Sequence, residues 1–383
     1  ALAGSVIAVA ALAAAAVFGA SLVGLVGTPH DYGQNWVQEV DFNFGSATGA
    51  QAGQMAQAIP SISGYAGGDY GQLTIDGVIV PAVGLDQVRG SGYLTLLAGR
   101  APAAPDEIAL GEQTLSAIGA RLGQTVQVTV NQVTTGGPGI KHPMRIVGVA
   151  VLPAFSRGSF SPTGLGTGAV LPASVLYSAV EAQSQAATLG CAKGEPCYNF
   201  FLLRYRPGAN LAAAAAKITG VLQASGCPVG SCIIAPVADQ RPGDIKNYAS
   251  IRDTPLALAV VLAVLAVGTL AHVLLTGVRR RRRDLALLKT LGFTRRQVLG
   301  TVAWEASAFA VVALLVGLPL GVIAGRWAWA VFASAAGVST AATVPLATVL
   351  LAIPATLLAA NLIAAAPGWE AARLRPALVL RTE

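Results

Sequence analysis

Four long apolar runs constrain this chain more than any other feature of its sequence. The runs cover residues 1–27, 254–278, 299–325 and 345–366. A helix needs roughly 20 apolar residues to cross a bilayer, and each run is long enough. Only 11% of the 383 residues are charged, whereas soluble domains carry about a quarter. The sequence therefore predicts an α-helical membrane protein with four transmembrane helices.

The first run, residues 1–27, has to be distinguished from a secretory signal. A signal peptide has a basic segment followed by about 7–15 apolar residues. Here the apolar run is longer, and nothing basic precedes it. We interpret the run as a transmembrane helix, and its many Ala and Gly residues predict close packing against another helix.

Basic residues are concentrated in two of the segments that connect or follow these runs. The loop 279–298 has one acid, Asp284, among the cations Arg279 to Arg283, Lys289, Arg295 and Arg296. The tail 367–383 adds three arginines, whereas residues 28–253 contain 13 Lys and Arg against 14 Asp and Glu. Because Lys and Arg mark cytoplasmic loops, the loop and the tail are expected inside, and residues 28–253 and 326–344 outside. The net charge of +7 then follows from topology, and no nucleic-acid partner is expected.

All cysteines fall in the predicted outside domain, at Cys191, Cys197, Cys227 and Cys232. An even number on the oxidising side of a membrane predicts disulfides. Of the three pairings, Cys191–Cys197 with Cys227–Cys232 is the most economical. A zinc site is the alternative, but neither pair has CxxC spacing and no histidine is near, so no metal is expected.

The outside domain, residues 28–253, is predicted to be α+β. Strand patterns at 36–44 and 61–65 flank a helix around 50–59, and strands at 199–205 and 232–237 flank a helix at 209–225. Two such β-α-β units predict a ferredoxin-like sheet covered by two helices. A β-rich insertion over about 70–170 is expected between them, with strands at 125–130 and 144–152. The domain shows no catalytic constellation and no cofactor motif, so no catalytic or cofactor-binding residue is assigned.

The cytoplasmic loop has a pattern of its own. Leu285, Leu288 and Leu291 recur at steps of three with Leu287 beside them, which predicts an apolar stripe on a short helix. Gly292 is suited to end that helix. Thr294 to Gln297 fits a capping box for a new helix, with the Thr294 hydroxyl capping the amide three residues on. Composition alone leaves open whether the stripe lies on lipid or docks into another protein.

Two stretches resemble the FtsX-like/MacB-type family of ABC transporter permeases. Residues 281–325 are similar to its signature region, at Arg281, Asp284, Leu287, Leu288, Lys289, Gly292, Thr294, Gln297, Glu305, Gly317, Gly321 and Gly325. Residues 96–128 are similar to its extracytoplasmic pattern, at Gly99, Arg100, Pro102, Glu107, Ile108 and Gly111. The tail also resembles the ending of the family, so the likeness follows the whole chain in order.

The resemblance implies a function for the leucine-striped segment. In this family it is the coupling helix, seated in a groove of a partner ATPase; the residues concerned are Asp284, Leu285, Leu287, Leu288, Lys289, Leu291 and Gly292. The implied partners are an ABC ATPase homodimer that binds ATP and Mg, and a second permease unit, as a homodimer or as the other half of a duplicated chain. A protein or lipid of the envelope is the implied substrate, and the bacterial plasma membrane the implied location.

ATP hydrolysis is expected in a separate subunit, because the sequence has no Walker A motif. A membrane-anchored receptor or adhesin is the alternative class. That class would explain the disulfides, but not three further spans and a leucine-striped basic loop.

Overall fold

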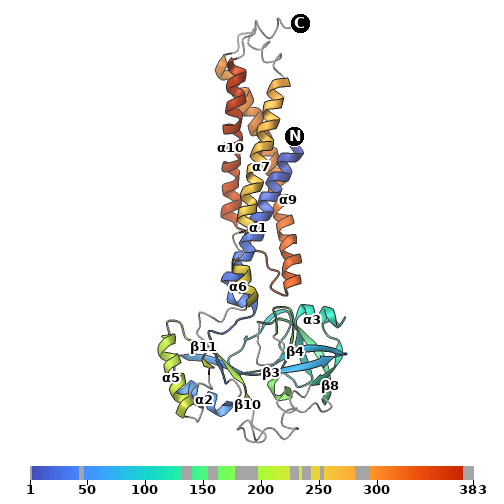
Figure 1. Ribbon diagram of the computed structural model, residues 1–383, viewed down its shortest axis with the longest axis vertical. Helices are drawn as coiled ribbons and strands as arrows, with labels where there is room; N and C mark the ends of the chain where they lie inside the picture. Colours follow the sequence, from blue (N-terminus) through green and yellow to red (C-terminus); the bar gives the residue numbers. More distant parts are fainter. Residues whose placement is uncertain are drawn as a thin grey trace. The chain divides into compact units, whose positions relative to one another are not determined.

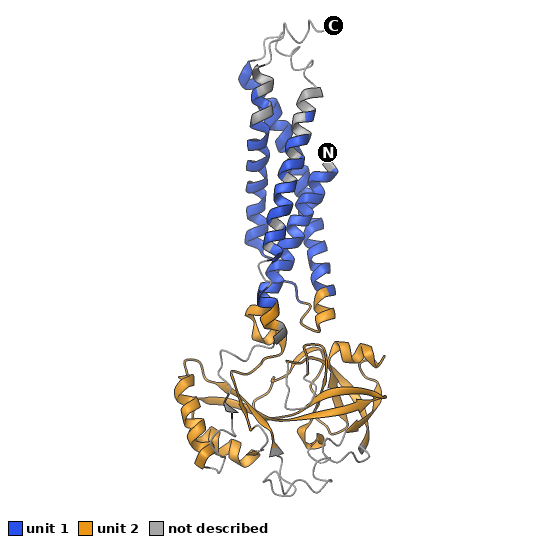
Figure 2. Cartoon of the chain, viewed as in Figure 1, with its two compact units in different colours: residues 1–24, 248–331, 341–383 blue, residues 25–247, 332–340 orange. Residues whose placement is uncertain are grey.

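The computed structural model describes residues 2–42, 47–130, 140–153, 163–176, 197–224, 233–234, 243–250, 254–280 and 294–373. The chain forms two compact units (Figure 2). Unit 1 consists of residues 1–24, 248–331 and 341–383, and unit 2 of residues 25–247 and 332–340.

Unit 1 is built from long helices that run alongside one another (Figure 1): α1 (Leu2–Gly27), α7 (Thr254–Arg280), α9 (Arg295–Ala336) and α10 (Leu346–Arg373). Three stretches are long and apolar enough to cross a membrane, namely Ala3–Gly27, Arg295–Ala336 and Leu346–Ala365. In α7 the apolar stretch found among the described residues is shorter, Val260–Thr269. The fourth span therefore stays a prediction.

Helix α9 is longer than the sequence analysis predicts. Its 42 residues run from Arg295 to Ala336, so residues 326–336, expected in an outside loop, are helical. The reason is that this stretch has good helix formers and no breaker until Gly337, whose φ of +69° ends the helix. Pro319 lies inside α9 without ending it, as neighbouring helices permit in membrane proteins.

Helices α1 and α9 pack closely through the glycines at positions 317, 321 and 325. A methyl group at Gly321 would lie 2.6 Å from Ala13 Cβ, and one at Gly317 would lie 2.9 Å from Val9 Cβ. At Gly325 the equivalent distance to Val17 Cβ is 2.9 Å. Distances under about 3 Å leave no room for a side chain, so small residues set the spacing. The predicted close packing of residues 1–27 is confirmed.

Helices α9 and α10 meet through a second small-residue seam, formed by Val302, Ala306, Ala310, Ala360 and Ala364. Beside it, Asn361 Nδ2 donates hydrogen bonds to Ser307 Oγ at 3.0 Å and to Leu357 O at 2.9 Å. An amide in hydrocarbon needs such partners, because no water is there to replace them.

Unit 2 contains a ten-stranded sheet with the order β12-β1-β11-β3-β4-β9-β6-β8-β5, and β7 pairs with β3 and β8. The strands are β1 (Gln38–Asp41), β3 (Ile62–Ile75), β4 (Val78–Arg89), β5 (Thr95–Gly99), β6 (Glu107–Leu110), β7 (Thr125–Val130), β8 (Ile140–Val151), β9 (Ala169–Leu171), β11 (Phe200–Tyr205) and β12 (Ile233–Ile234). A separate short pair joins β2 (Ala47–Thr48) to β10 (Cys197–Tyr198).

Both predicted β-α-β units are present as elements. Helix α2 (Gly49–Ala58) lies between β1 and β3 in the chain, and α5 (Leu211–Ala224) lies between β11 and β12. Figure 1 labels both helices. Helix α2 starts at a capping box: Gln51 N donates to Thr48 Oγ1 at 3.3 Å, and Thr48 N donates to Gln51 Oε1 at 2.8 Å. Both helices and the sheet enclose one core, which includes Met55, Phe201 and Ile218.

The β-rich part is continuous with this first half, because β3 belongs to both. Strands β3 and β4 form a long hairpin whose turn is Asp76-Gly77, with φ of 46° and 88°. Asp-Gly is a favoured pair for such a turn. Strand β7 has the predicted bounds, β8 begins earlier than predicted, and β4, β5, β6 and β9 were not predicted as separate strands. A second core, including Ile108, Val128 and Met144, lies within this part.

Two short helices complete the described part of unit 2, apart from the 3-10 helix η1 (Pro29–Tyr32). They are α3 (Glu112–Ala117), directly after β6, and α6 (Gly243–Ser250), whose residues from 248 on belong to unit 1.

Candidate functional site

The predicted coupling residues, Asp284, Leu285, Leu287, Leu288, Lys289, Leu291 and Gly292, all lie outside the described residues. The structure does describe the helices on either side. Helix α7 ends at Arg280 and α9 begins at Arg295. The segment 281–293 therefore connects two long helices of unit 1.

The start of α9 is capped, but only half of the predicted capping box is formed. Thr294 N donates to Gln297 Oε1 at 2.8 Å, which is the half contributed by the glutamine. The Thr294 hydroxyl also donates to Gln297 Oε1, at 3.0 Å, instead of accepting from the Gln297 amide. That amide donates to Thr294 O at 3.1 Å. The glutamine carbonyl thus collects both Thr294 donors, which corrects the predicted role of the hydroxyl.

The segment that follows α1 is held within unit 2 by a set of hydrogen bonds that we call the η1 clamp: His30, Asn35, Thr95 and Arg204. Asn35 Nδ2 donates to Thr95 Oγ1 at 2.7 Å, and Thr95 Oγ1 donates to His30 O at 2.8 Å. Arg204 Nε donates to Asn35 O at 2.5 Å. The clamp joins η1 to β5 through His30, and it joins Asn35, a few residues on, to β11. The chain leaving α1 is therefore held at two separated strands.

The Arg204 guanidinium also holds the loop before β5. Its terminal nitrogens donate to Ser91 O at 2.8 Å and to Gly92 O. The guanidinium carbon lies 4.1 Å from the centroid of the Tyr93 ring, a cation–π contact. Burial raises the pKa of Tyr93 to about 12, although Arg204 opposes this shift. The phenol therefore stays neutral at any physiological pH.

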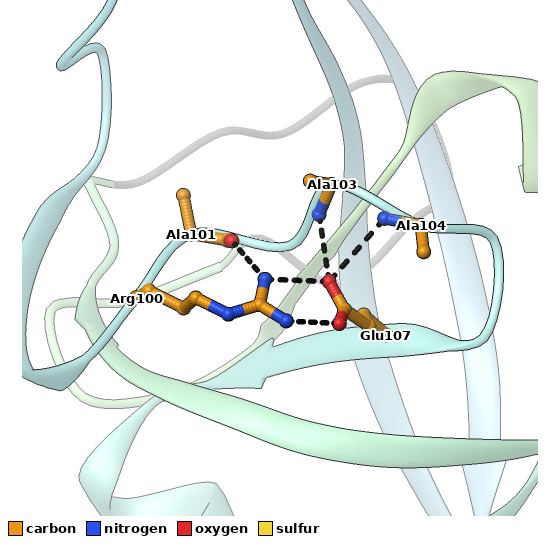
Figure 3. Close-up of polar contacts among 5 residues, drawn as sticks. All are labelled: Arg100, Ala101, Ala103, Ala104 and Glu107. Atoms are coloured by element: carbon orange, nitrogen blue, oxygen red, sulfur yellow. Dashed lines mark hydrogen bonds and ion pairs between the residues drawn. The ribbon is translucent and has the colours of Figure 1, made fainter.

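The extracytoplasmic motif has a structural explanation (Figure 3). Arg100 pairs with both carboxylate oxygens of Glu107, and the same carboxylate accepts from Ala103 N at 3.0 Å and Ala104 N at 3.3 Å. The hydrogen bonds from Arg100 and then from Ala103 lower the pKa of Glu107 to about 2. The motif residues thus close the loop between β5 and β6 and do not form a catalytic pair.

The glycines of the motif are required by close backbone approaches. Gly99 has φ +75°, and a methyl group there would lie 3.0 Å from Gly148 Cα. A methyl group at Gly111 would lie 3.0 Å from Thr167 N and would also strike the Gly166 carbonyl. Both positions therefore need glycine for packing within unit 2.

The ion pair predicts a specific acid response of the Glu107→Gln variant. Because the folded pKa of about 2 is below the ordinary value, the pair contributes stability above about pH 4.5 and loses it as the pH falls toward 2. We expect wild type to exceed the variant by about 2 °C in Tm at pH 7, and the difference to vanish near pH 2. Thermal unfolding of the full chain in detergent measures it, with Glu112→Gln as control. An unchanged difference at pH 2 would contradict the assignment.

One further carboxyl in the sheet is perturbed. Burial raises the pKa of Glu39 to about 7, against the lowering effect of the hydrogen bond that Tyr70 Oη donates at 3.1 Å; Asp41 raises it further. A buried carboxylic acid whose hydrogen-bond partner is a tyrosine does not make the nucleophile–base pair that acyl transfer needs. We assign it no catalytic role.

The described residues bear on the metal prediction only in part and do not test the disulfide prediction. No group of three or more His, Cys, Asp or Glu side chains that could hold a metal occurs among the described residues. Cys191, Cys227 and Cys232 lie outside the described residues, and only the backbone of Cys197 is described, in β10. The disulfides therefore remain predictions.

Unit 1 has an open apolar groove of about 550 Å³, lined mainly by α1 and α10, with Pro255 of α7 and Leu318 of α9. Its described lining includes Leu12, Gly19, Val349 and Ala352, and its polar side chains are those of Thr348 and Thr356. A lining of this chemistry accepts hydrocarbon, such as a lipid tail or an apolar helix face, and disfavours charged cargo.

The chain combines long apolar helices with a large α/β domain that is held to the segment after α1. This combination indicates a class of protein, namely a membrane protein with an extracytoplasmic domain. The model of the MacB-like periplasmic core domain matches residues 1–221, and that of the FtsX-like permease C-terminal region matches residues 256–376. The chain belongs to this family of FtsX/MacB-type ABC transporter permeases. It is therefore a permease component with a periplasmic domain.

Two solved structures are similar to this chain at low sequence identity. The periplasmic region of MacB from Actinobacillus actinomycetemcomitans is 15% identical, covering 54% of this chain and 91% of that one, with a TM-score of 0.36. The extracellular domain of the noncanonic ABC-type transporter YknZ from Gram-positive bacteria is 11% identical, covering 53% and 100%, with a TM-score of 0.33. No curated protein matches the chain.

Proposed function

We propose that this permease component receives motion from a separate ABC ATPase and transmits it to the periplasmic domain. The domain then acts in export, extraction or regulation of an envelope substrate. The segment with Asp284, Leu285, Leu287, Leu288, Lys289, Leu291 and Gly292 is the proposed docking helix for the ATPase. ATP and Mg belong to the partner homodimer, and a second permease unit completes the transporter.

The observation that carries this proposal is the η1 clamp. A domain that only binds a ligand can hang on a flexible linker, which decouples it from the membrane. Here three hydrogen bonds of 2.5–2.8 Å hold the segment after α1 on β5 and β11. A displacement of that segment must therefore move two strands of the sheet. This stiffness supports transmission and is unnecessary for a receptor or adhesin.

The packing of α1 against α9 also supports the proposal that motion is transmitted through the helices. The glycine seam with α1 excludes any side chain at Gly317, Gly321 and Gly325. Since interlocked surfaces at this spacing resist sliding, α1 and α9 are expected to move together. Motion that reaches α9 from the adjoining segment 281–293 is thereby passed to α1 and its clamp.

We infer further details from the same family. The strand order β12-β1-β11-β3 supports a ferredoxin-like half of the periplasmic domain, as predicted. Helix α7 would be the fourth span. The cysteines are proposed to pair as Cys191–Cys197 and Cys227–Cys232.

Co-purification tests the proposed function. We expect the chain, solubilised in detergent from bacterial membranes, to bring with it a nucleotide-binding subunit that hydrolyses ATP. Mass spectrometry identifies the subunit, and phosphate release sensitive to orthovanadate measures its activity. If no nucleotide-binding protein accompanies the chain, the receptor or adhesin class replaces the transporter assignment.

A further inference from the structure

The outer end of α9 stops in a well-formed Schellman motif. Gly337, in the left-handed conformation at φ +69°, donates its N–H to Ser334 O at 3.2 Å. Val338 N donates to Ala333 O at 2.9 Å, and both Val338 and Ala333 are fully buried. This pattern satisfies two of the carbonyls that a helix end leaves without partners.

A third carbonyl at this helix end is satisfied by the periplasmic domain itself. Gln113 Nε2, from the first turn of α3, donates to Ala335 O at 2.5 Å. Gln113 Oε1 accepts from Thr167 Oγ1 at 2.8 Å, and Gln113 N donates to Gly166 O at 2.9 Å. One glutamine therefore joins α9, α3 and the turn at 164–167.

The backbones at this place are in direct contact. A methyl group at Gly337 would lie 2.6 Å from Gly166 N and would also strike Gly166 Cα. Conversely, a methyl group at Gly166 would lie 2.9 Å from Gly337 Cα. Neither side can carry a side chain, so the fit is reciprocal. Residues 332–340 accordingly form one compact unit with residues 25–247.

Hydrogen bonds connect the contact between Gly337 and Gly166 to strands inside the sheet. Gly111 N, at the end of β6, donates to Gly168 O at 3.0 Å, and Gly168 N donates to Thr114 Oγ1 at 2.8 Å. Gly168 directly precedes β9, and β6 lies between β9 and β8 in the sheet order. A force applied at the end of α9 thus reaches two neighbouring strands inside the sheet.

We propose that Gln113, Gly166, Thr167, Ala335 and Gly337 form a latch, the α9 latch, through which the third membrane helix moves the periplasmic domain. This inference rests on the proposed function and adds a second route by which motion of the helices reaches the periplasmic domain. The η1 clamp holds β5 and β11, whereas the α9 latch holds β6 and the entry to β9. Two attachments from two packed helices can turn or strain the domain, which a single attachment cannot.

The test uses two variants of the full chain, purified with the ATPase that accompanies it. Gln113→Ala removes the side-chain bridge, and Gly337→Val removes the backbone contact. Ser116→Ala, an exposed position on α3, is the matched control. Amide hydrogen exchange is followed in peptides covering 111–117 and 29–35, with and without ATP and orthovanadate.

We expect nucleotide to change exchange in both peptides of the wild type and of Ser116→Ala. Gln113→Ala loses both side-chain hydrogen bonds of the latch, and the side chain in Gly337→Val would strike Gly166. In both variants the response at 111–117 should therefore fall at least about fivefold, while the response at 29–35 persists. If both variants respond at 111–117 as the wild type does, the latch is not a transmission route. If the wild type responds in neither peptide, the proposed function itself fails.

Discussion

The Leu288→Asp variant should no longer bind its ATPase, although the chain still folds. Leu288 lies in the middle of the leucine stripe 285–291, so its replacement puts a charge into the proposed docking surface. A buried apolar anchor replaced by a carboxylate costs at least about 2 kcal/mol, or about 30-fold in affinity. Co-purification with the nucleotide-binding subunit measures the loss, and vanadate-sensitive ATP hydrolysis in the same eluate should fall in proportion.

Ala286→Asp is the matched control, because it adds the same charge within the same segment but off the leucine stripe. Position 286 is about 160° from Leu288 on a helix, and it is three or four residues from none of the leucines of the stripe. We expect Ala286→Asp to retain most of the ATPase. If both variants lose it equally, charge alone is responsible. If both retain it, the stripe lies on lipid and the coupling assignment fails.

The helices of unit 1 and the small-residue interface of α1 were predictable because their signals are local. Hydropathy over about 20 residues is sufficient to locate a membrane helix, and α1 follows the predicted range closely. The recurrence of Gly at 317, 321 and 325 marks one face of a single helix. The true end of α9 was also present in the sequence, at Gly337, but the hydropathy criterion stopped at Gly325, just before the charged residue Arg326.

The order of strands β4 to β9 and the contacts of the latch were not predictable in the same way, because both depend on residues far apart in the chain. Gln113 and Ala335 are 222 positions apart, and nothing near Gln113 indicates a helix end as its partner. The Arg100–Glu107 pair illustrates the opposite case. The family motif indicated that both residues matter, but only the geometry shows that they close a loop. The Asp76-Gly77 turn was a local hairpin signal that the sequence analysis missed.

A bulky side chain at Gly321 should strongly destabilise the packing of α1 against α9. Gly321→Leu should prevent α1 and α9 from packing, because even the first added carbon would strike Ala10 O and lie 2.6 Å from Ala13 Cβ. Overpacking of a rigid interface costs about 1–3 kcal/mol, and here backbone atoms are the obstacle, so the upper end applies. We expect the variant to lose its monodisperse peak in detergent and to unfold at a lower Tm. Size-exclusion chromatography after heating measures both.

A smaller substitution separates packing from intrinsic helix propensity. At Gly300, on the same helix, nothing lies within 4 Å of the position a methyl group would take. Gly300→Ala should therefore raise the Tm, since Ala is favoured over Gly in a helix by up to about 1 kcal/mol. Gly321→Ala gains the same propensity but forces the two helices apart, so its Tm should fall. A higher Tm for Gly300→Ala together with a lower Tm for Gly321→Ala would establish that α1 and α9 are in contact at Gly321. A rise in both variants would mean that the helices can separate without cost, and α9 could then not carry α1 with it.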